Sequence, residues 1–239
     1  MPSRSERFPT THWTRLLQAA EPDSDESRGA LASLCANYWY PIYALIRREG
    51  NGPDEALDLT QDYFARLIEK GVLSKVKAHK GRFRAFLRTD CGFFLADQRD
   101  YRTALKRGGR RLISMSLDDA EGRYRSEPRD PNAMSPDRLF DHAWAVDLLD
   151  RSMDRVAREY AESGRASLFE AIRGSLAGHA DQTRAAAATG LTIVAVESAV
   201  RRLRKRLSIV VRELIAQTLD EPTLEQVEDE VKALFAALC

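Results

Sequence analysis

Hydrophobic residues along most of the chain recur every three or four positions, which is the period of an amphipathic α-helix. This spacing predicts an early helix over residues 27–49, with a kink or break at Pro41. It predicts a second helix that begins at Pro53, a favoured first helical residue, and ends at Gly71. A third helix is expected over about 81–107, so almost every periodic segment in the first half of the chain is predicted to be a helix.

Residues 190–207, GLTIVAVESAVRRLRKRL, contain sequence signals for a strand and for a helix. Residues 191–196 are rich in β-branched side chains, which favour a strand. The longer pattern is helical, because hydrophobic residues recur every three or four positions from Val196 to Leu214 and no period of two is kept. We therefore predict one amphipathic helix over about 193–214, with an apolar side and a basic side.

The segment before this helix completes a helix-turn-helix pattern. A short alanine-rich helix is predicted over 181–189, Gly190 is suited to a left-handed turn, and Thr192 can cap the next helix. The second helix of such a motif can enter the major groove of DNA, with Ser198 and Arg201 at base edges and later cations at phosphates. The candidate DNA-binding residues of this motif are Thr192, Ser198, Arg201, Arg202, Arg204 and Lys205.

The fold class predicted from these patterns is all-α, with two helical domains joined by a linker. Residues 108–135 are rich in glycine, proline, serine and charge without a sustained period, which is typical of a linker. Helices over 136–160, capped by Ser135, and over 163–176 open the second domain. The predicted boundaries are an N-terminal extension 1–27, a first domain 28–107, the linker 108–135, a second domain 136–217 and an acidic C-terminal helix 218–239.

The C-terminal helix is marked by Thr223-Leu-Glu-Gln226, which fits a capping box. Its apolar stripe is expected to pack on the second domain. Its acidic face could instead mimic DNA, contact a partner or cover part of the second domain.

Charge is distributed unevenly behind a net charge of +1. Residues 82–111 hold nine basic and three acidic residues, and residues 194–212 hold six basic and one acidic. The tail from Glu213 onward holds seven acidic residues and one basic residue. Two basic segments and one acidic segment are therefore present, and basic clusters of this kind favour an anionic partner such as DNA.

Several functional classes have little support in the sequence. No apolar run approaches the roughly 18 residues needed to cross a bilayer, and the start MPSRSERFPTTHW lacks the apolar region of a secretory signal, so we expect a cytoplasmic protein without membrane contact. The three cysteines and four histidines are scattered without CxxC or HExxH spacing, so no metal site, disulfide or cofactor is expected. An enzyme is the weakest candidate.

The segment 58–109 resembles region 2 of bacterial RNA polymerase sigma factors, most closely the small extracytoplasmic-function type. The resemblance rests on Asp58-Leu-Thr-Gln61-Asp62-Tyr63-Phe64, on Gly81-Arg-Phe83-Arg84-Ala-Phe86-Leu87, and on Asp97 later in the same helix. The helix-turn-helix then falls where that family has region 4. Region 2, linker and region 4 follow in order, so the resemblance covers about 28–107 and 136–217.

The resemblance implies that the chain directs core RNA polymerase to specific promoters and initiates transcription. Residues 28–107 would bind core polymerase and the −10 element, and residues 136–217 would bind the −35 element. The implied core-polymerase contacts are Asp58, Gln61 and Asp62, and the implied −10 contacts are Phe93, Arg99, Tyr101, Arg102 and Lys106. The implied partners are core RNA polymerase, promoter DNA and an anti-sigma or other regulatory protein.

Two departures from the family pattern concern DNA contacts. Phe93 stands where the family often has asparagine, and Arg184 stands where an acidic residue is usual. Two other functions fit the same residues. One is a helix-turn-helix regulator that binds DNA without docking on polymerase, and the other is a sigma-like protein-interaction adaptor.

Overall fold

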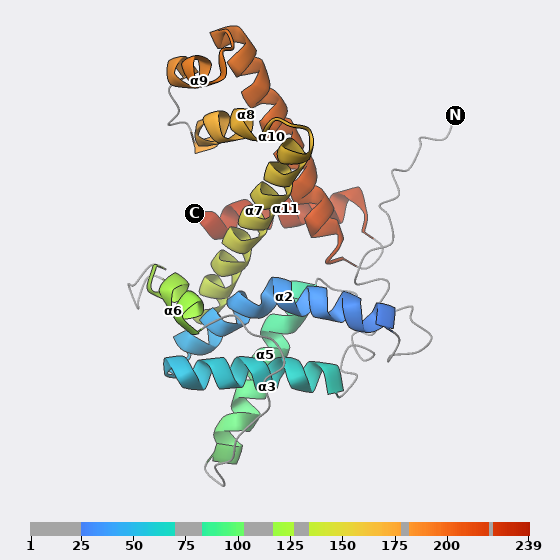
Figure 1. The fold of residues 1–239 in the computed structure, drawn as a ribbon. Coiled ribbons are helices and arrows are strands. Elements are labelled where there is room, and N and C mark those ends of the chain that lie inside the picture. The colour runs from blue at the N-terminus through green and yellow to red at the C-terminus, as the bar shows by residue number, and fades with distance from the viewer. Residues whose placement is uncertain (1–24, 70–82, 103–116, 127–133, 178–181, 220–221) are drawn as a thin grey trace, which may run out of the picture. The chain divides into compact units, whose positions relative to one another are not determined.

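A computed structural model of the chain describes residues 25–69, 83–102, 117–126, 134–177, 182–219 and 222–239 (Figure 1). Every regular element in these ranges is a helix, so the predicted all-α class is confirmed for them. The stretch 190–207 is not a strand, because α10 runs from Ile193 to Ala216. No helix in the described ranges has both the length and the apolar character needed to cross a membrane.

The chain divides into two compact units. Unit 1 contains the described residues up to Asp147 together with Ile215–Cys239, and unit 2 is Leu148–Leu214. The division therefore falls inside two helices, α7 (Pro136–Glu162) and α10, and not inside the segment 108–135 expected to be the linker.

Unit 1 is built on α2 (Asp25–Arg48), α3 (Pro53–Glu69) and α5 (Phe83–Arg102). The second half of α2 is buried on almost all sides because α2 packs against α3, α5 and α6 (Leu117–Ser126), and the helix continues through Pro41 without being split. Aromatic rings join the helices: Tyr38 meets Phe83 edge-on at 5.2 Å, and Tyr63 meets Phe94 at 5.5 Å between ring centroids.

Helix α6 lies within the residues that the sequence pattern assigned to a linker. Its Glu121 carboxylate accepts hydrogen bonds from the Tyr43 hydroxyl at 2.8 Å and from Arg47 at 3.0 and 3.1 Å. The Arg123 guanidinium lies 4.0 Å from the centre of the Tyr40 ring. Residues 117–126 of the predicted linker therefore form a helix, which contacts with α2, distant in sequence, support and local periodicity does not reveal.

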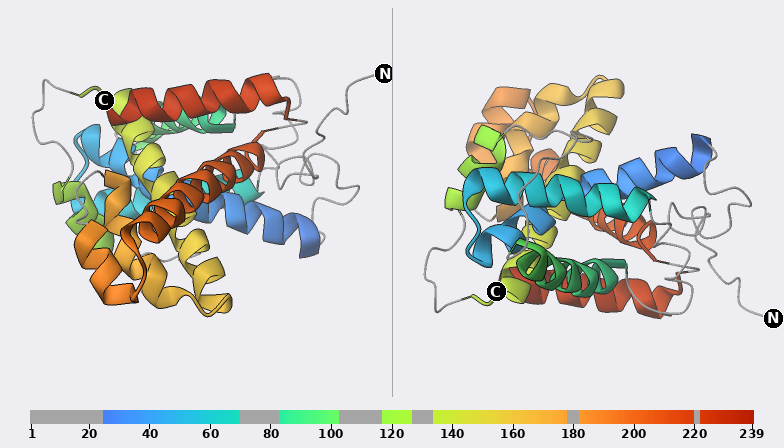
Figure 2. Two further views of the ribbon diagram at one scale, coloured as in Figure 1. Left: turned by 90° about the horizontal axis from the view of Figure 1, so that it is seen from above. Right: turned by 90° about the horizontal axis from the view of Figure 1, so that it is seen from below.

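The C-terminal helix α11 (Leu224–Leu238) has the predicted capping box, in which Thr223 and Gln226 bond each other's backbone N–H groups. It belongs to unit 1, together with residues 136–147 and 215–217 of the predicted second domain. Helices α5 and α11 lie side by side in both views of Figure 2, and an ion pair between Arg84 and Glu230 joins them.

Unit 2 consists of the C-terminal half of α7, α8 (Ala166–Ile172), a 3₁₀ turn η2 (Arg173–Ala177), α9 (Gln182–Thr189) and most of α10. Its core is formed by Val156, Tyr160, Phe169, Ile172, Ala185, Val196, Ala199, Val200, Leu203 and Val210. Residues 196, 199, 200, 203 and 210 define the buried side of α10 and leave the opposite side exposed.

Candidate nucleic-acid interface

The turn between α9 and α10 has the two local features predicted from the sequence, a left-handed glycine and an N-cap. Gly190 takes a left-handed conformation with φ of 69°, which residues with a side chain rarely adopt. The Thr192 hydroxyl accepts a hydrogen bond from the backbone N–H of Ala195 at 3.2 Å and so caps α10. The Thr192 side chain therefore stabilises the start of α10.

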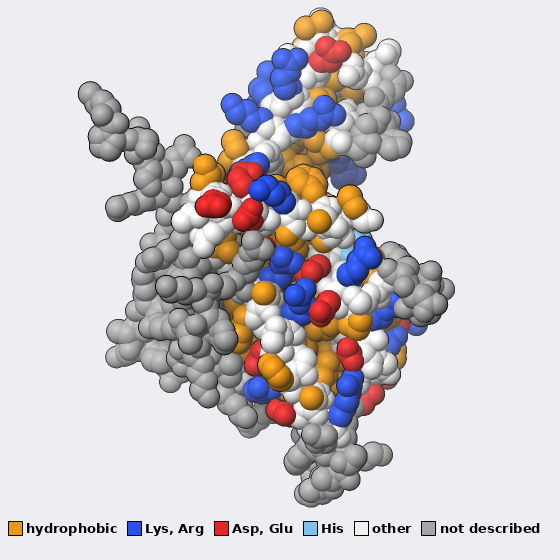
Figure 3. All heavy atoms as spheres, turned by 180° about the vertical axis from the view of Figure 1, so that it is seen from behind, with side chains coloured by type: hydrophobic (Ala, Val, Ile, Leu, Met, Phe, Trp, Pro, Cys, Tyr) orange, Lys and Arg blue, Asp and Glu red, His pale blue; other side chains and the backbone are white. Residues whose placement is uncertain are grey.

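Three cations on the exposed side of α10 are available to a ligand. Arg201, Arg202 and Lys205 are exposed, and none of them forms an ion pair or hydrogen bond with another residue in the described ranges. Ser198 lies one turn before them and is half-buried. Basic side chains outnumber acidic ones on the face of unit 2 seen in the upper part of Figure 3. This surface can attract a polyanion without first breaking internal ion pairs.

Two other cations of α10 are already held by the protein. The Arg206 guanidinium donates two hydrogen bonds to the Glu159 carboxylate, both at 2.7 Å, and lies 3.5 Å from Glu213. The hydrogen bonds from Arg206 lower the pKa of Glu159. Arg204, predicted to contact DNA, donates to the Ser175 carbonyl at 2.8 Å, so one of its donors is occupied although the side chain is exposed.

Two exposed residues of α10, Val194 and Glu197, are not among the DNA contacts predicted from the sequence. Val194 is 71% exposed, and Glu197 is exposed without an ion pair to a described residue. Counting back from Arg201 by four and by seven reaches Glu197 and Val194, which places all three on one helix face. The helical period could therefore have identified them.

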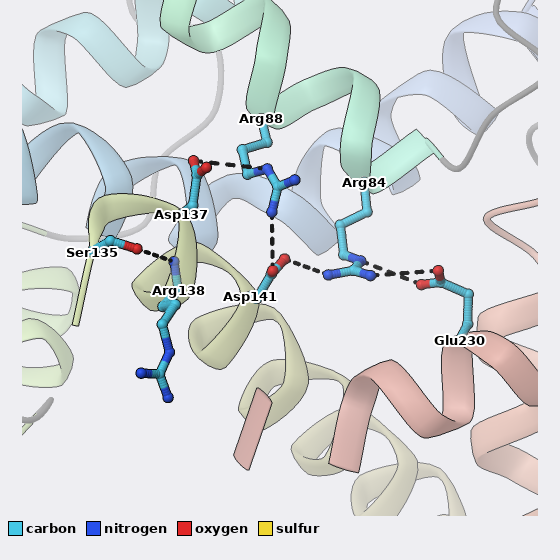
Figure 4. A network of polar contacts seen from close by, with 7 residues as sticks. All are labelled: Arg84, Arg88, Ser135, Asp137, Arg138, Asp141 and Glu230. Carbon is cyan, nitrogen blue, oxygen red and sulfur yellow. Dashed lines mark hydrogen bonds and ion pairs between the residues drawn. The ribbon is translucent and has the colours of Figure 1, made fainter. Parts of the chain in front are cut away.

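The first basic segment contributes fewer exposed cations than its charge count implies. Figure 4 shows Arg84 and Arg88, from α5, directed toward acidic side chains of α7 and α11. Arg84 pairs with Asp141 and Glu230, and Arg88 lies 3.0 Å from Asp141. These two arginines stabilise unit 1 and are not free for DNA.

The candidate −10 contacts differ in exposure and pairing, and some of them lie outside the described part of the structure. Phe93 is 65% exposed on α5, whereas Arg99 is exposed but pairs with Glu49 at 2.6 Å. Six helical positions separate Phe93 from Arg99, which turns them about 120° apart. Tyr101 and Arg102 lie on α5 but their side chains are outside the described part of the structure, and Lys106 lies outside the described residues altogether.

The candidate polymerase contacts on α3 differ in exposure. Asp58 is exposed and Asp62 is half-buried. The burial of Asp62, together with the nearby charge of Asp58, raises the pKa of Asp62. Gln61 was expected on the surface with them, but it is only 7% exposed. That expectation is wrong because Gln61 lies on the side of α3 that also buries Thr60 and Phe64.

Among the described residues, no group of three or more His, Cys, Asp or Glu side chains is placed to hold a metal ion. The candidate site described above is a charged helical surface on α10. Comparisons with protein-family models, with curated proteins and with solved structures found no match.

Proposed function

We propose that the chain is an RNA polymerase sigma factor of the extracytoplasmic-function type, which directs core polymerase to promoters and initiates transcription. The observation that carries the proposal is the helix-turn-helix of α9 and α10. Its second helix has an apolar side in the core of unit 2 and an exposed side with three cations that pair with no described residue, Arg201, Arg202 and Lys205. A surface of this kind suits the major groove and its flanking phosphates.

Helix α5 supports the second half of the proposal. Phe93 is 65% exposed and offers a flat apolar surface on which an unpaired base can stack. Opening a duplex requires surfaces that hold backbones and capture bases, and it requires no catalytic residue. The proposed protein acts in the cytoplasm, without a cofactor, together with core polymerase and promoter DNA.

A regulator that binds DNA without polymerase is the second candidate. It is favoured by the burial of Gln61, because only two of the three predicted polymerase contacts, Asp58 and Asp62, are then accessible to polymerase. The two functions differ in whether the chain forms a stoichiometric complex with core polymerase.

Run-off transcription with the full chain, core polymerase and genomic fragments tests the proposal. We expect discrete transcripts that need the chain, and a complex with core polymerase that survives purification. Arg201→Ala is expected to reduce the transcripts while the complex persists. Arg158→Ala, which removes an exposed arginine from α7 in the same unit, is the matched control and is expected to leave transcription unchanged.

The outcomes separate the candidates. DNA binding without a polymerase complex would replace the sigma assignment with that of a regulator. A polymerase complex without salt-sensitive DNA binding would favour the protein-interaction adaptor. Equal loss of polymerase binding and DNA binding in Arg201→Ala would count against separate roles for the two units.

A further inference from the structure

A carboxylate that pairs with no described residue lies on the basic side of α10. Glu197 is exposed, and its neighbour one turn later, Arg201, does not form an ion pair with it. Glu197 is the fifth residue of the helix, beyond the first turn in which an acidic side chain is stabilised by the helix dipole. Neither an ion pair with a described residue nor the helix dipole therefore accounts for this acid. Against a phosphate backbone it is unfavourable unless it meets a donor.

An exposed apolar side chain lies beside it. Val194 is 71% exposed, although valine is a weak helix former and gains little from packing at this position. Val194, Glu197 and Arg201 follow the spacing i, i+3, i+7 and share the face opposite the buried residues Val196 and Leu203. They span about 10 Å along the helix axis, the length of roughly three base-pair steps.

The three side chains match three different base edges of the major groove. A carboxylate accepts a hydrogen bond from the cytosine amino group, an apolar side chain packs on the thymine methyl group, and arginine bonds guanine. The free cations Arg202 and Lys205 on the same helix supply the charge complementarity to phosphates.

We infer that Glu197 and Val194 determine sequence specificity, with Glu197 reading a C·G pair and Val194 reading a T·A pair in duplex DNA. This inference rests on the proposed function, because it requires α10 to enter the major groove. The two pairs lie within about two base-pair steps of each other, since the residues are three helical positions apart. Glu197 thereby excludes sites that place no amino donor opposite it.

Selection of the full chain against a pool of random duplexes tests the role of Glu197. The wild-type chain is expected to enrich a site with a preferred C·G pair. Glu197→Ala is expected to lose the preference at that pair by roughly 5-fold or more, while its affinity for non-specific duplex does not fall. The matched control is Glu170→Ala, which removes an exposed acid of α8 in the same unit and is expected to keep the wild-type site.

Removing the methyl group of the preferred thymine tests the role of Val194. Replacing the preferred thymine by deoxyuracil is expected to weaken the wild-type chain several-fold and to leave Val194→Ala unaffected. Equal sensitivity of both chains to deoxyuracil would overturn the role of Val194. Both variants should unfold like the wild type, because each altered side chain is exposed.

Failure of the inference and failure of the proposed function are distinct. A selected site that is unchanged in Glu197→Ala would overturn the inference and leave DNA binding intact. The absence of any salt-sensitive duplex binding by the wild-type chain would overturn the proposed function itself.

Discussion

Arg84 and Glu230 are 146 positions apart in the chain and form a two-point ion pair, with nitrogen–oxygen distances of 3.3 and 3.4 Å. Figure 4 shows Glu230, which is 2% exposed, directed toward Arg84. The Arg84 guanidinium also lies 4.3 Å from the centre of the Trp144 ring. Burial disfavours the charged form of Arg84, but the carboxylates of Glu230 and Asp141 outweigh it and raise its pKa. The pair therefore holds α11 to α5 in unit 1.

Glu230→Ala is expected to destabilise the protein by about 3 kcal/mol, because it leaves a buried guanidinium with Asp141 as its remaining acidic partner. Urea unfolding measures the change. Lys232→Ala, on the exposed side of the same helix, is the control and is expected to change stability by less than about 0.5 kcal/mol. Similar small effects from both variants would show that α11 does not depend on this pair.

Features that depend on neighbouring residues were predictable from the sequence. The caps at Ser135, Thr192 and Thr223 each bond a backbone group three positions later, so their chemistry is contained in four residues. The left-handed turn at Gly190 is equally local. The helical period of α10 also separated its buried side from its exposed side.

Contacts between distant residues were not predictable in the same way. An arginine on a helix gives the same sequence signal whether it pairs with no described residue, as Arg202 does, or pairs with a remote acid, as Arg84 does. The basic count of residues 82–111 therefore overstated the free charge of α5. For the same reason the pattern could not show that Glu159, on α7, holds Arg206.

Gly190→Ala is expected to destabilise unit 2 by about 1 kcal/mol, because alanine at φ of 69° is strained although no atom lies within 4 Å of the added Cβ. Gly92→Ala is the matched control within α5. That site is helical and equally open, so the change is expected to stabilise the protein by about 0.5–1 kcal/mol. Thermal unfolding of both variants checks the opposite signs, and a loss of stability in both would contradict the conformational explanation.

The stability that Glu121 contributes is expected to depend on pH. Hydrogen bonds from Arg47, and then from Tyr43, lower the pKa of Glu121 below its ordinary value of 4.5. The ionised carboxylate is therefore favoured in the folded state. Its contribution is complete above about pH 4.5 and is lost as the pH falls through the lowered pKa.

Urea unfolding of the wild type and Glu121→Gln between about pH 6 and pH 3 measures this dependence. The difference between the two chains should shrink toward the acid end. Glu170→Gln, which alters an exposed pair with Arg173, should differ little from the wild type across the range. A difference for Glu121→Gln that stays constant with pH would show that the carboxylate charge is not what stabilises α6.

Arg202 and Arg206 are four positions apart on α10 and are expected to respond differently when DNA binding is measured against salt. Arg202 has no partner among the described residues, so its contact with a phosphate would release a counterion. Arg202→Ala should reduce the slope of log K against log salt by about 1. Arg206 is neutralised by Glu159, so Arg206→Ala should leave the slope unchanged and lower the unfolding midpoint. Equal reductions of the slope would mean that Arg206 exchanges Glu159 for a phosphate on binding, and the basic face of α10 would then extend beyond its free cations.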